Sequence, residues 1–258
     1  MIDEPLKIIN NKTSAEALSE IDSLVKKKER LEYVLVANLN HLAKIKRNSM
    51  LQRVYRDASM VLPDGKYVYW LSRLYGTPLK EYIRGLDFFY EICKLCVIKR
   101  YKCLMVGGKP GTVEKARGIL ETNYSGLDVK GAFFYPLGEV GGHIALDRQI
   151  IDALNKDDID ILFLGLGTPR EQAWIENYKS HIKCVIIGVG SVYDFIAGEI
   201  VEAPRIFQHS GLEWFWRFFD EPKRLWKRYF IENTIFVIEA LFDALRRRLL
   251  RILNIRVS

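Results

Sequence analysis

Several acidic and basic side chains follow apolar runs, at positions where they could move a proton or hold an anion. Asp64 precedes Gly65 and follows the apolar residues 61–63, and an Asp-Gly pair at such a point often forms only a turn. The same carboxylate, held at the end of a strand, could accept a proton from a substrate hydroxyl group. Arg84 and Asp87 form either an ordinary ion pair or contacts to a diphosphate and a sugar, respectively. Residue types alone leave both interpretations open.

Histidine and cysteine residues do not form a recognisable metal site. His41 follows Asn38 after an apolar run, but no HxH or HExxH partner accompanies it. Cys93 and Cys96 form a CxxC pair in a stretch that favours a helix, and no second pair follows at zinc-binding spacing. We interpret the cysteines as core or surface thiols of a protein in a reducing compartment. We predict neither a metal site nor a cofactor.

A glycine-rich turn, VGGKPG at 106–111, lies between an apolar run and a helical pattern. Backbone N–H groups near Gly107 and Gly108 could hold a phosphate at the start of that helix. The turn matches neither GxGxxG nor a Walker A loop, so dinucleotide binding and P-loop chemistry are not indicated. A tight strand-to-helix turn without a ligand explains the glycines equally well.

The stretch GLGTPREQ at 165–172 follows another apolar run. Thr168 is expected to cap a helix that has Pro169 as its first residue. Capping does not explain why Gly167, Glu171 and Gln172 occur together, so this turn is a candidate binding site.

A third glycine-rich stretch contains Gly188, Gly190 and Asp194. Asp194 is either a carboxylate at the start of a helix or a contact to a ribose or base. The glycines again follow an apolar run, as at the two preceding turns.

These turns must be positioned by regular elements, and the hydrophobic pattern indicates which. Apolar runs rich in β-forming residues alternate with stretches of helical periodicity. Strand, glycine turn and helix in repetition predict an α/β fold, in which helices cover both faces of a parallel, Rossmann-like sheet. Ligands of such sheets bind at the carboxyl ends of the strands. The expected strands are 33–37, 102–106, 160–164 and 184–187, and the expected helices include 112–123 and 171–180.

The composition changes near residue 211, so we predict a core at 1–210 and a helical appendage at 211–258. The appendage contains ten Lys or Arg and six Asp or Glu, which places +4 of the total +7 charge there. It is too polar to cross a bilayer, and no recognised nucleic-acid motif accompanies its basic residues. We expect it to lie on an anionic membrane surface, against another subunit or on the core. One apolar helical stripe comprises Ile231, Ile235, Ile238, Phe242, Leu245 and Leu249.

Taken in order, these motifs resemble the WecG/TagA/CpsF family of glycosyltransferases over about 33–229. Their order and spacing are more specific than any one of them. The resemblance rests on Asn38 with His41, Pro63-Asp64-Gly65, Arg84-Gly85-Leu86-Asp87, the VGGKPG turn, GLGTPREQAWI, GVGSVYDFIAG, Ala203-Pro204, LEWFWR at 212–217 and EPKR at 221–224.

The resemblance implies an inverting, metal-independent transfer from a UDP-sugar to a sugar linked to undecaprenyl diphosphate. The transferred group would be a hexose, an N-acetylhexosamine or its uronic acid, and the enzyme would be cytoplasmic and peripheral on the inner face of the bacterial plasma membrane. Asp64 would be the general base. The donor would contact Asn38, Gly107, Gly108, Gly167, Pro169, Glu171, Gln172, Gly188, Gly190 and Asp194. The acceptor or the diphosphate would contact His41, Arg84, Asp87, Arg217, Arg224 and Arg228. The last three are the candidates for neutralising the leaving diphosphate, and they share one face if their segment is a continuous helix.

Three positions depart from the family pattern. Val36 stands where Thr is frequent, Glu171 where Gln is frequent, and Glu202 where Arg is frequent. These changes leave open the identity of the sugar. An alternative is a nucleotide-sugar-binding or regulatory protein without activity, and release of UDP in the presence of a lipid acceptor would separate the two.

Overall fold

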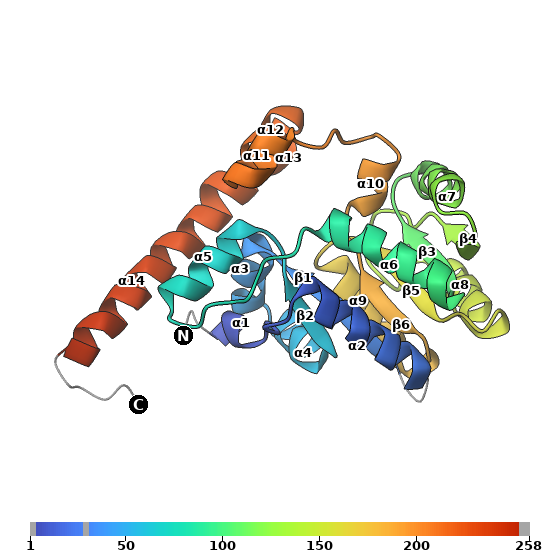
Figure 1. Cartoon of the computed structure of the whole chain (residues 1–258), viewed down its shortest axis with the longest axis horizontal. Helices are drawn as coiled ribbons and strands as arrows, with labels where there is room; N and C mark the ends of the chain where they lie inside the picture. The colour runs from blue at the N-terminus through green and yellow to red at the C-terminus, as the bar shows by residue number, and fades with distance from the viewer. Residues whose placement is uncertain (1–3, 28–30, 253–258) are drawn as a thin grey trace.

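The computed structural model describes residues 4–27 and 31–252, and its centre is a single β-sheet (Figure 1). Its strands pair in the order β2-β1-β6-β5-β3-β4, and every pairing is parallel. The predicted α/β fold with a parallel sheet is therefore confirmed. The strands are β1 (Glu32–Ala37), β2 (Met60–Pro63), β3 (Lys102–Gly107), β4 (Asp128–Phe133), β5 (Ile161–Gly165) and β6 (Val185–Gly188).

The path of the chain through the sheet indicates where a ligand should bind. β1 is followed by its neighbour β2 toward one edge, and β3 by its neighbour β4 toward the other edge. β5 and β6 then fill the centre between β1 and β3. Because the two halves extend in opposite directions, the loops after the central strands diverge at their carboxyl ends and leave room for a ligand.

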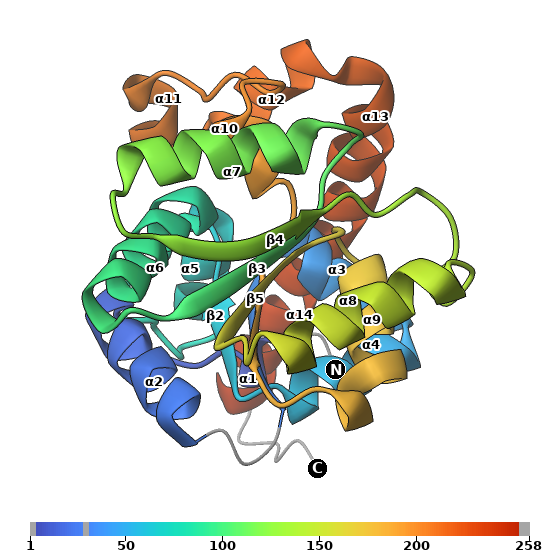
Figure 2. The ribbon, with the colours of Figure 1, turned by 90° about the vertical axis from the view of Figure 1, so that its right-hand side faces the viewer.

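Helices cover both faces of the sheet (Figure 2). Successive strand residues alternate between the faces, so that Val34 belongs to one buried cluster and Leu35 to the other. The face of Val34 is covered by α2 (Ser14–Lys27), α6 (Gly85–Lys99), α7 (Thr112–Asn123) and α10 (Val192–Ile196). The face of Leu35 is covered by α3 (Leu39–Arg47), α4 (Ser49–Asp57), α5 (Lys66–Leu74), α8 (Ile144–Lys156), α9 (Arg170–Tyr178) and α14 (Thr234–Ile252).

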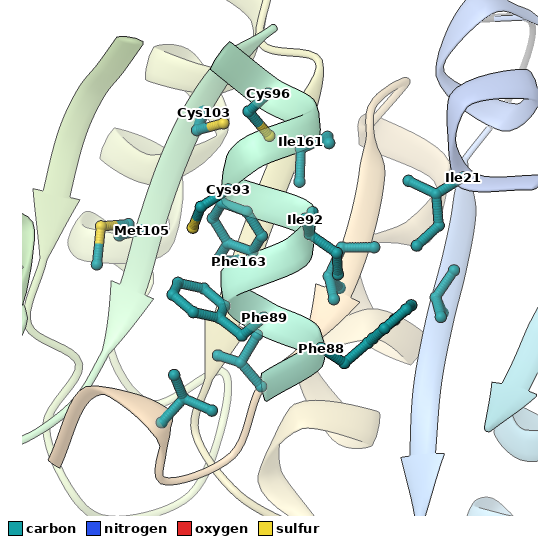
Figure 3. Packing of buried hydrophobic residues seen from close by; sticks show 14 of the residues in the cluster. Ile21, Phe88, Phe89, Ile92, Cys93, Cys96, Cys103, Met105, Ile161 and Phe163 are labelled. Carbon is teal, nitrogen blue, oxygen red and sulfur yellow. The ribbon is translucent and has the colours of Figure 1, made fainter. Parts of the chain in front are cut away.

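Three of the cysteines lie inside the packing of α6 against the sheet (Figure 3), and Cys184 is buried in the cluster on the opposite face. Cys93 and Cys96 on α6 are buried beside Cys103 of β3, and all of them are free thiols. Burial raises the pKa of the Cys93 thiol above its usual range, which disfavours the reactive thiolate. Their interpretation as core thiols is confirmed.

The appendage does not form one continuous helix. Arg217, Arg224 and Arg228 were expected to share one face only if it did. α12 (Glu213–Asp220) ends at Glu221, whose φ of −130° and ψ of 58° are not helical, and α13 (Pro222–Trp226) follows. Pro222 has no N–H to continue the preceding helix. Arg217 therefore lies on a different helix from Arg228, which belongs to a π-helical segment (Lys227–Asn233), so the condition for one shared helical face is not met.

α14 packs on the core along one side and leaves the predicted stripe exposed. Phe236 and Ala240 are fully buried in the core cluster, and Tyr75 Oη donates to the Ala240 oxygen at 3.0 Å. The exposed fraction of the stripe residues ranges from 40% to 70%. In the described ranges, no helix is both long enough and apolar enough to cross a bilayer. Shorter elements are α1 (Glu4–Lys7), α11 (Arg205–Ser210), which lies beside α12, and a 3-10 turn (Lys179–His181).

Candidate functional site

Asp64 lies at the carboxyl end of β2, where backbone contacts fix it. Its N–H donates to the Ala37 oxygen at 3.0 Å, next to the last residue pair of β1 and β2. Gly65 has a φ of +84° and turns the chain into α5, while its N–H donates to the Ile83 oxygen at 3.2 Å. A side chain at Gly65 would be strained in this conformation. The Asp-Gly pair therefore forms a turn and also holds a carboxylate at the edge of the site.

Asn38 and Gly85 orient this carboxylate. Asn38 Nδ2 donates to Asp64 Oδ2 at 3.4 Å, and the Gly85 N–H donates to Oδ1 at 3.3 Å. Asn38 is also the N-cap of α3, where its Oδ1 accepts from the N–H groups of Asn40 and His41. We predicted that Asn38 contacts the UDP-sugar donor. In the structure both polar groups of its side chain bond to protein atoms, and Asn38 positions Asp64.

The surroundings of Asp64 favour proton uptake. Burial raises the pKa of its carboxyl group above the usual 3.8, and the bonds from Asn38 and Gly85, with the charges of Arg228 and Arg217, act in the opposite direction. A carboxylate with a raised pKa is a stronger base for a hydroxyl proton near neutral pH.

Glu171 joins the turns after β5 and β6. Its Oε1 accepts from the Gly167 N–H at 3.0 Å and from the Gly190 N–H at 2.8 Å. A Cβ at Gly188 would meet Oε2 at 3.0 Å, so the carboxyl group packs directly on β6. The four residues come together in an internal brace, which occupies the N–H groups of Gly167 and Gly190, two of the glycines that the resemblance assigned to the sugar donor.

Glu171 also gives the fold a pH dependence. Burial raises its pKa from 4.5 to about 7, against the lowering effect of its backbone N–H donors. The pKa of Glu171 is higher in the folded than in the unfolded state. Its contribution to the free energy of unfolding is therefore complete below pH 4.5 and is lost as the pH rises through 7. This pKa change corresponds to about 3 kcal/mol. We expect Glu171→Gln, whose amide oxygen can accept the same two bonds, to gain stability relative to the parent between pH 5 and 8.

Thermal unfolding of both proteins at the two pH values measures this gain. Glu176→Gln is the matched control, because Glu176 lies on the same helix, is partly exposed and pairs with Lys179 at 3.0 Å. The unfolding temperature of Glu176→Gln should differ from that of the parent by the same amount at both pH values. The same equal difference for Glu171→Gln would show that Glu171 does not titrate in this range.

The start of α9 differs from the prediction. The helix begins at Arg170, Pro169 is its N-cap residue without a side-chain cap, and the Thr168–Pro169 peptide bond is cis. Thr168 is therefore not the cap, and Pro169 is not the first helical residue. The carboxylate of Glu171 instead reaches back to the N–H of Gly167, which precedes the helix.

The turn after β3 is shaped by close packing. Gly107 has a φ of +133°, and a Cβ there would lie 2.2 Å from the Gly165 oxygen. The Gly108 N–H donates to the same oxygen at 3.3 Å. Contact between β3 and β5 therefore explains both glycines, and a phosphate contact at this turn stays a prediction.

His41 and Gln172 belong to one polar network behind the site. His41 Nδ1 lies 2.9 Å from the Val36 oxygen and 3.3 Å from Tyr55 Oη, and Gln172 Nε2 donates to Tyr55 Oη at 3.4 Å. Burial, Arg228 and Lys44 lower the pKa of His41 to about 3. The imidazole is therefore neutral near neutral pH, and its Nδ1–H donates to Val36.

Arg84 forms ion pairs with carboxylates, which agrees with the first of the two interpretations of Arg84 and Asp87, an ordinary ion pair. Its guanidinium lies 2.7 Å from Asp87, 3.1 Å from Glu213 of α12 and 3.4 Å from Glu202. The pair with Glu213 ties the appendage to the core, whereas Glu202, one of the departures from the family pattern, pairs with Arg84 within the core. Contacts from Arg84 or Asp87 to a substrate stay predictions.

Arg228 and Arg217 lie within electrostatic range of Asp64, since both affect its pKa. Arg228 Nη2 donates to Asn38 Oδ1 at 3.4 Å, and Arg217 lies over the Phe195 ring. The side chain of Arg224 lies outside the described residues. Asp194 lies in α10, which contacts α6 and α7, and its nucleoside contact stays a prediction.

Lys44 is a cation of this site that sequence reasoning missed. Its Nζ donates to the Thr168 oxygen at 3.4 Å. The sequence feature that could have identified Lys44 is its spacing of three residues from His41, which places both side chains on one side of a helix. Among the described residues, no group of three or more His, Cys, Asp or Glu is placed to hold a metal ion.

Comparison with known proteins matches this arrangement to one family. The sequence model of the glycosyl transferase WecG/TagA/CpsF family matches residues 6–250. The chain is 25% identical over 198 residues to an N-acetylglucosaminyldiphosphoundecaprenol N-acetyl-beta-D-mannosaminyltransferase of Bacillus spizizenii, covering 76% of this chain and 74% of that protein. It is 30% identical over 177 residues to the Bacillus subtilis protein of the same name, covering 68% and 66%. A Staphylococcus aureus protein of that name is 26% identical over 170 residues, covering 65% and 64%. The chain thus belongs to the WecG/TagA/CpsF family and is a glycosyltransferase.

Proposed function

We propose that the protein transfers a hexose, an N-acetylhexosamine or its uronic acid from a UDP-sugar to a sugar carried by undecaprenyl diphosphate, with inversion. The observation that carries this proposal is the Asp64 carboxylate, held by Asn38 and Gly85 beside two arginines. A base and anion-stabilising cations in one site suit the displacement of a nucleoside diphosphate. The names of the relatives support a lipid-diphosphate acceptor.

The proposed reaction is a single displacement. Asp64 takes the proton of the acceptor hydroxyl, and the hydroxyl oxygen attacks the anomeric carbon of the donor. The bond from that carbon to the β-phosphate oxygen breaks, and its electron pair leaves with UDP. Arg217 and Arg228 offset the charge that develops on the diphosphate. No cofactor is part of this proposal, so activity is expected to persist in EDTA.

The exposed stripe of α14 supports a peripheral location on the inner face of the plasma membrane. Its apolar side chains stand outside the core packing, and basic residues accompany them in the appendage. Such a helix binds in the interface of a bilayer that contains anionic lipid. A second copy of the chain is the alternative partner for the stripe.

A donor screen tests the proposed activity. The full chain is combined with vesicles that contain a prenyl-diphosphate-linked N-acetylglucosamine and with a panel of UDP-hexoses, UDP-N-acetylhexosamines and UDP-uronic acids. We expect UDP release that requires both donor and acceptor, with a disaccharide on the lipid, and no loss of rate in EDTA. Binding of UDP-sugars without transfer to any acceptor would indicate a binding or regulatory protein, and strict dependence on Mg²⁺ or Mn²⁺ would contradict the metal-free mechanism.

A further inference from the structure

Lys44 is a cation of the site that the mechanism above does not use. It lies on α3, one helical turn after His41, and is partly buried. Within the part of the chain that the structure describes, its Nζ donates one hydrogen bond, to the Thr168 oxygen at 3.4 Å. Among the residues at 4–27 and 31–252, no carboxylate oxygen is placed within 4 Å of this Nζ. An ordinary surface ion pair therefore does not explain Lys44.

Arg228 lies on the π-helical segment that packs against α3, and its charge acts on Lys44. Burial and the charge of Arg228 lower the pKa of Lys44, and Glu232 has the opposite effect. The Glu232 carboxylate is itself engaged, since its Oε2 accepts from Asn40 Nδ2 at 2.7 Å. The third neighbour, His41, is neutral near neutral pH because its pKa is about 3. Two like charges held together in a partly buried place are stabilised by an anion between them.

Asn38 lies between Arg228 and the base. Its Oδ1 faces Arg228 at 3.4 Å, and its Nδ2 faces Asp64 at 3.4 Å. In a displacement with inversion, the attacking oxygen and the leaving oxygen lie on opposite sides of the anomeric carbon. The base side of Asn38 therefore suits the acceptor hydroxyl, and the cation side suits the leaving group.

Other anion sites at this end of the sheet are less suitable. The N–H groups of Gly167 and Gly190 already donate to Glu171. The N–H of Gly108 donates to the Gly165 oxygen. Lys109 in the same turn is exposed, so water would weaken its attraction for a phosphate.

We infer that Lys44 and Arg228 together bind the diphosphate of the donor and stabilise it as it leaves. The inference rests on the proposed UDP-sugar donor, and it adds a binding residue from the core to the arginines of the appendage. As the anomeric carbon–oxygen bond breaks, the electron pair stays on the β-phosphate oxygen. The ammonium of Lys44 donates hydrogen bonds to the diphosphate without giving up a proton.

Binding of UDP, UMP and uridine by calorimetry tests this role. The full-length proteins are the parent, Lys44→Gln, Lys44→Arg and Lys109→Gln, the last being a matched loss of one positive charge in the turn after β3. We expect Lys44→Gln to weaken UDP binding about 10- to 100-fold, as befits loss of a charged hydrogen bond, and to change uridine binding less than about threefold. Lys44→Arg should retain most of the UDP affinity, and Lys109→Gln should bind like the parent.

Thermal unfolding separates binding from a structural role. Because the charge of Lys44 is disfavoured in the free protein, Lys44→Gln should unfold at the same temperature as the parent or higher. Unchanged UDP binding by Lys44→Gln, or an equal loss for UDP and uridine, would overturn the inference. A loss of UDP affinity in Lys109→Gln, and not in Lys44→Gln, would place the diphosphate at the turn after β3. A parent that binds no UDP would refute the proposed function itself.

Discussion

Replacing Asp64 with Asn is expected to lower the rate of sugar transfer by roughly 10²–10⁴-fold while UDP affinity changes little. The amide has nearly the same shape, and its oxygen can still accept the Gly85 N–H that now donates to Oδ1 at 3.3 Å. It cannot accept the proton of the acceptor hydroxyl. Turnover at saturating donor and acceptor measures the loss, and calorimetry with UDP measures the retained binding.

Glu91→Gln is the matched control for this change. Glu91 lies on α6, is partly exposed and pairs with Lys94 at 2.6 Å, so its variant removes one carboxylate without removing the proposed base or a predicted substrate contact. We expect it to keep most of its turnover. Near-normal turnover in Asp64→Asn would remove Asp64 from the mechanism, and loss of UDP binding in that variant would point to a structural role.

A triple change of Ile238, Phe242 and Leu245 to Ser should detach the protein from vesicles and lower transfer to a vesicle-borne acceptor. Their side chains are 47%, 70% and 56% exposed in the structure, so the core loses little when they change. Complete burial of such a side chain contributes about 1.5–3 kcal/mol. Partial burial of three in a bilayer surface therefore suggests a loss of roughly 10²–10³-fold in vesicle binding. UDP binding and the unfolding temperature should stay close to those of the parent.

Ile98→Ser and Leu137→Ser provide the control, since these side chains are 74% and 87% exposed on other elements. They should leave vesicle binding unchanged. Sedimentation of all variants with neutral and with anionic vesicles, and of the proteins alone, completes the test. A triple variant that binds vesicles normally but loses self-association would identify a second copy of the chain as the partner of the stripe.

The fold was predictable where strands are buried on both faces, and less so elsewhere. β1, β3, β5 and β6 are short apolar runs with little exposure, which is the pattern of a covered parallel sheet. β4 lies at the edge, and its exposed Lys130 and central Gly131 hide the apolar pattern. Pro222 begins a new helix in the appendage, and because the spacing of the arginines alone does not reveal such a break, it could not predict their arrangement.

The site was predictable as a set of residues but not as a set of contacts. Residues that follow parallel strands meet at one edge of a sheet, which brings Asn38, Asp64 and Glu171 together. Spacing could not show that Glu171 bonds to two glycine turns, because that contact depends on how far β5 and β6 bring their turns toward each other. Lys44 was missed because its neighbour Arg228 lies 184 positions away in the sequence.

The π-helical segment Lys227–Asn233 links two surfaces of the protein. Arg228 reaches Asn38, Glu232 reaches Asn40, and the next residue begins α14 with its exposed stripe. If docking of α14 stabilises this segment, it strengthens nucleotide binding, and thermodynamic reciprocity requires the nucleotide to strengthen docking by the same factor. The protein would then hold the membrane most tightly while loaded with donor and loosen its hold once UDP has departed. Such a cycle would confine the activated sugar to the surface where its lipid acceptor resides and limit its loss to water.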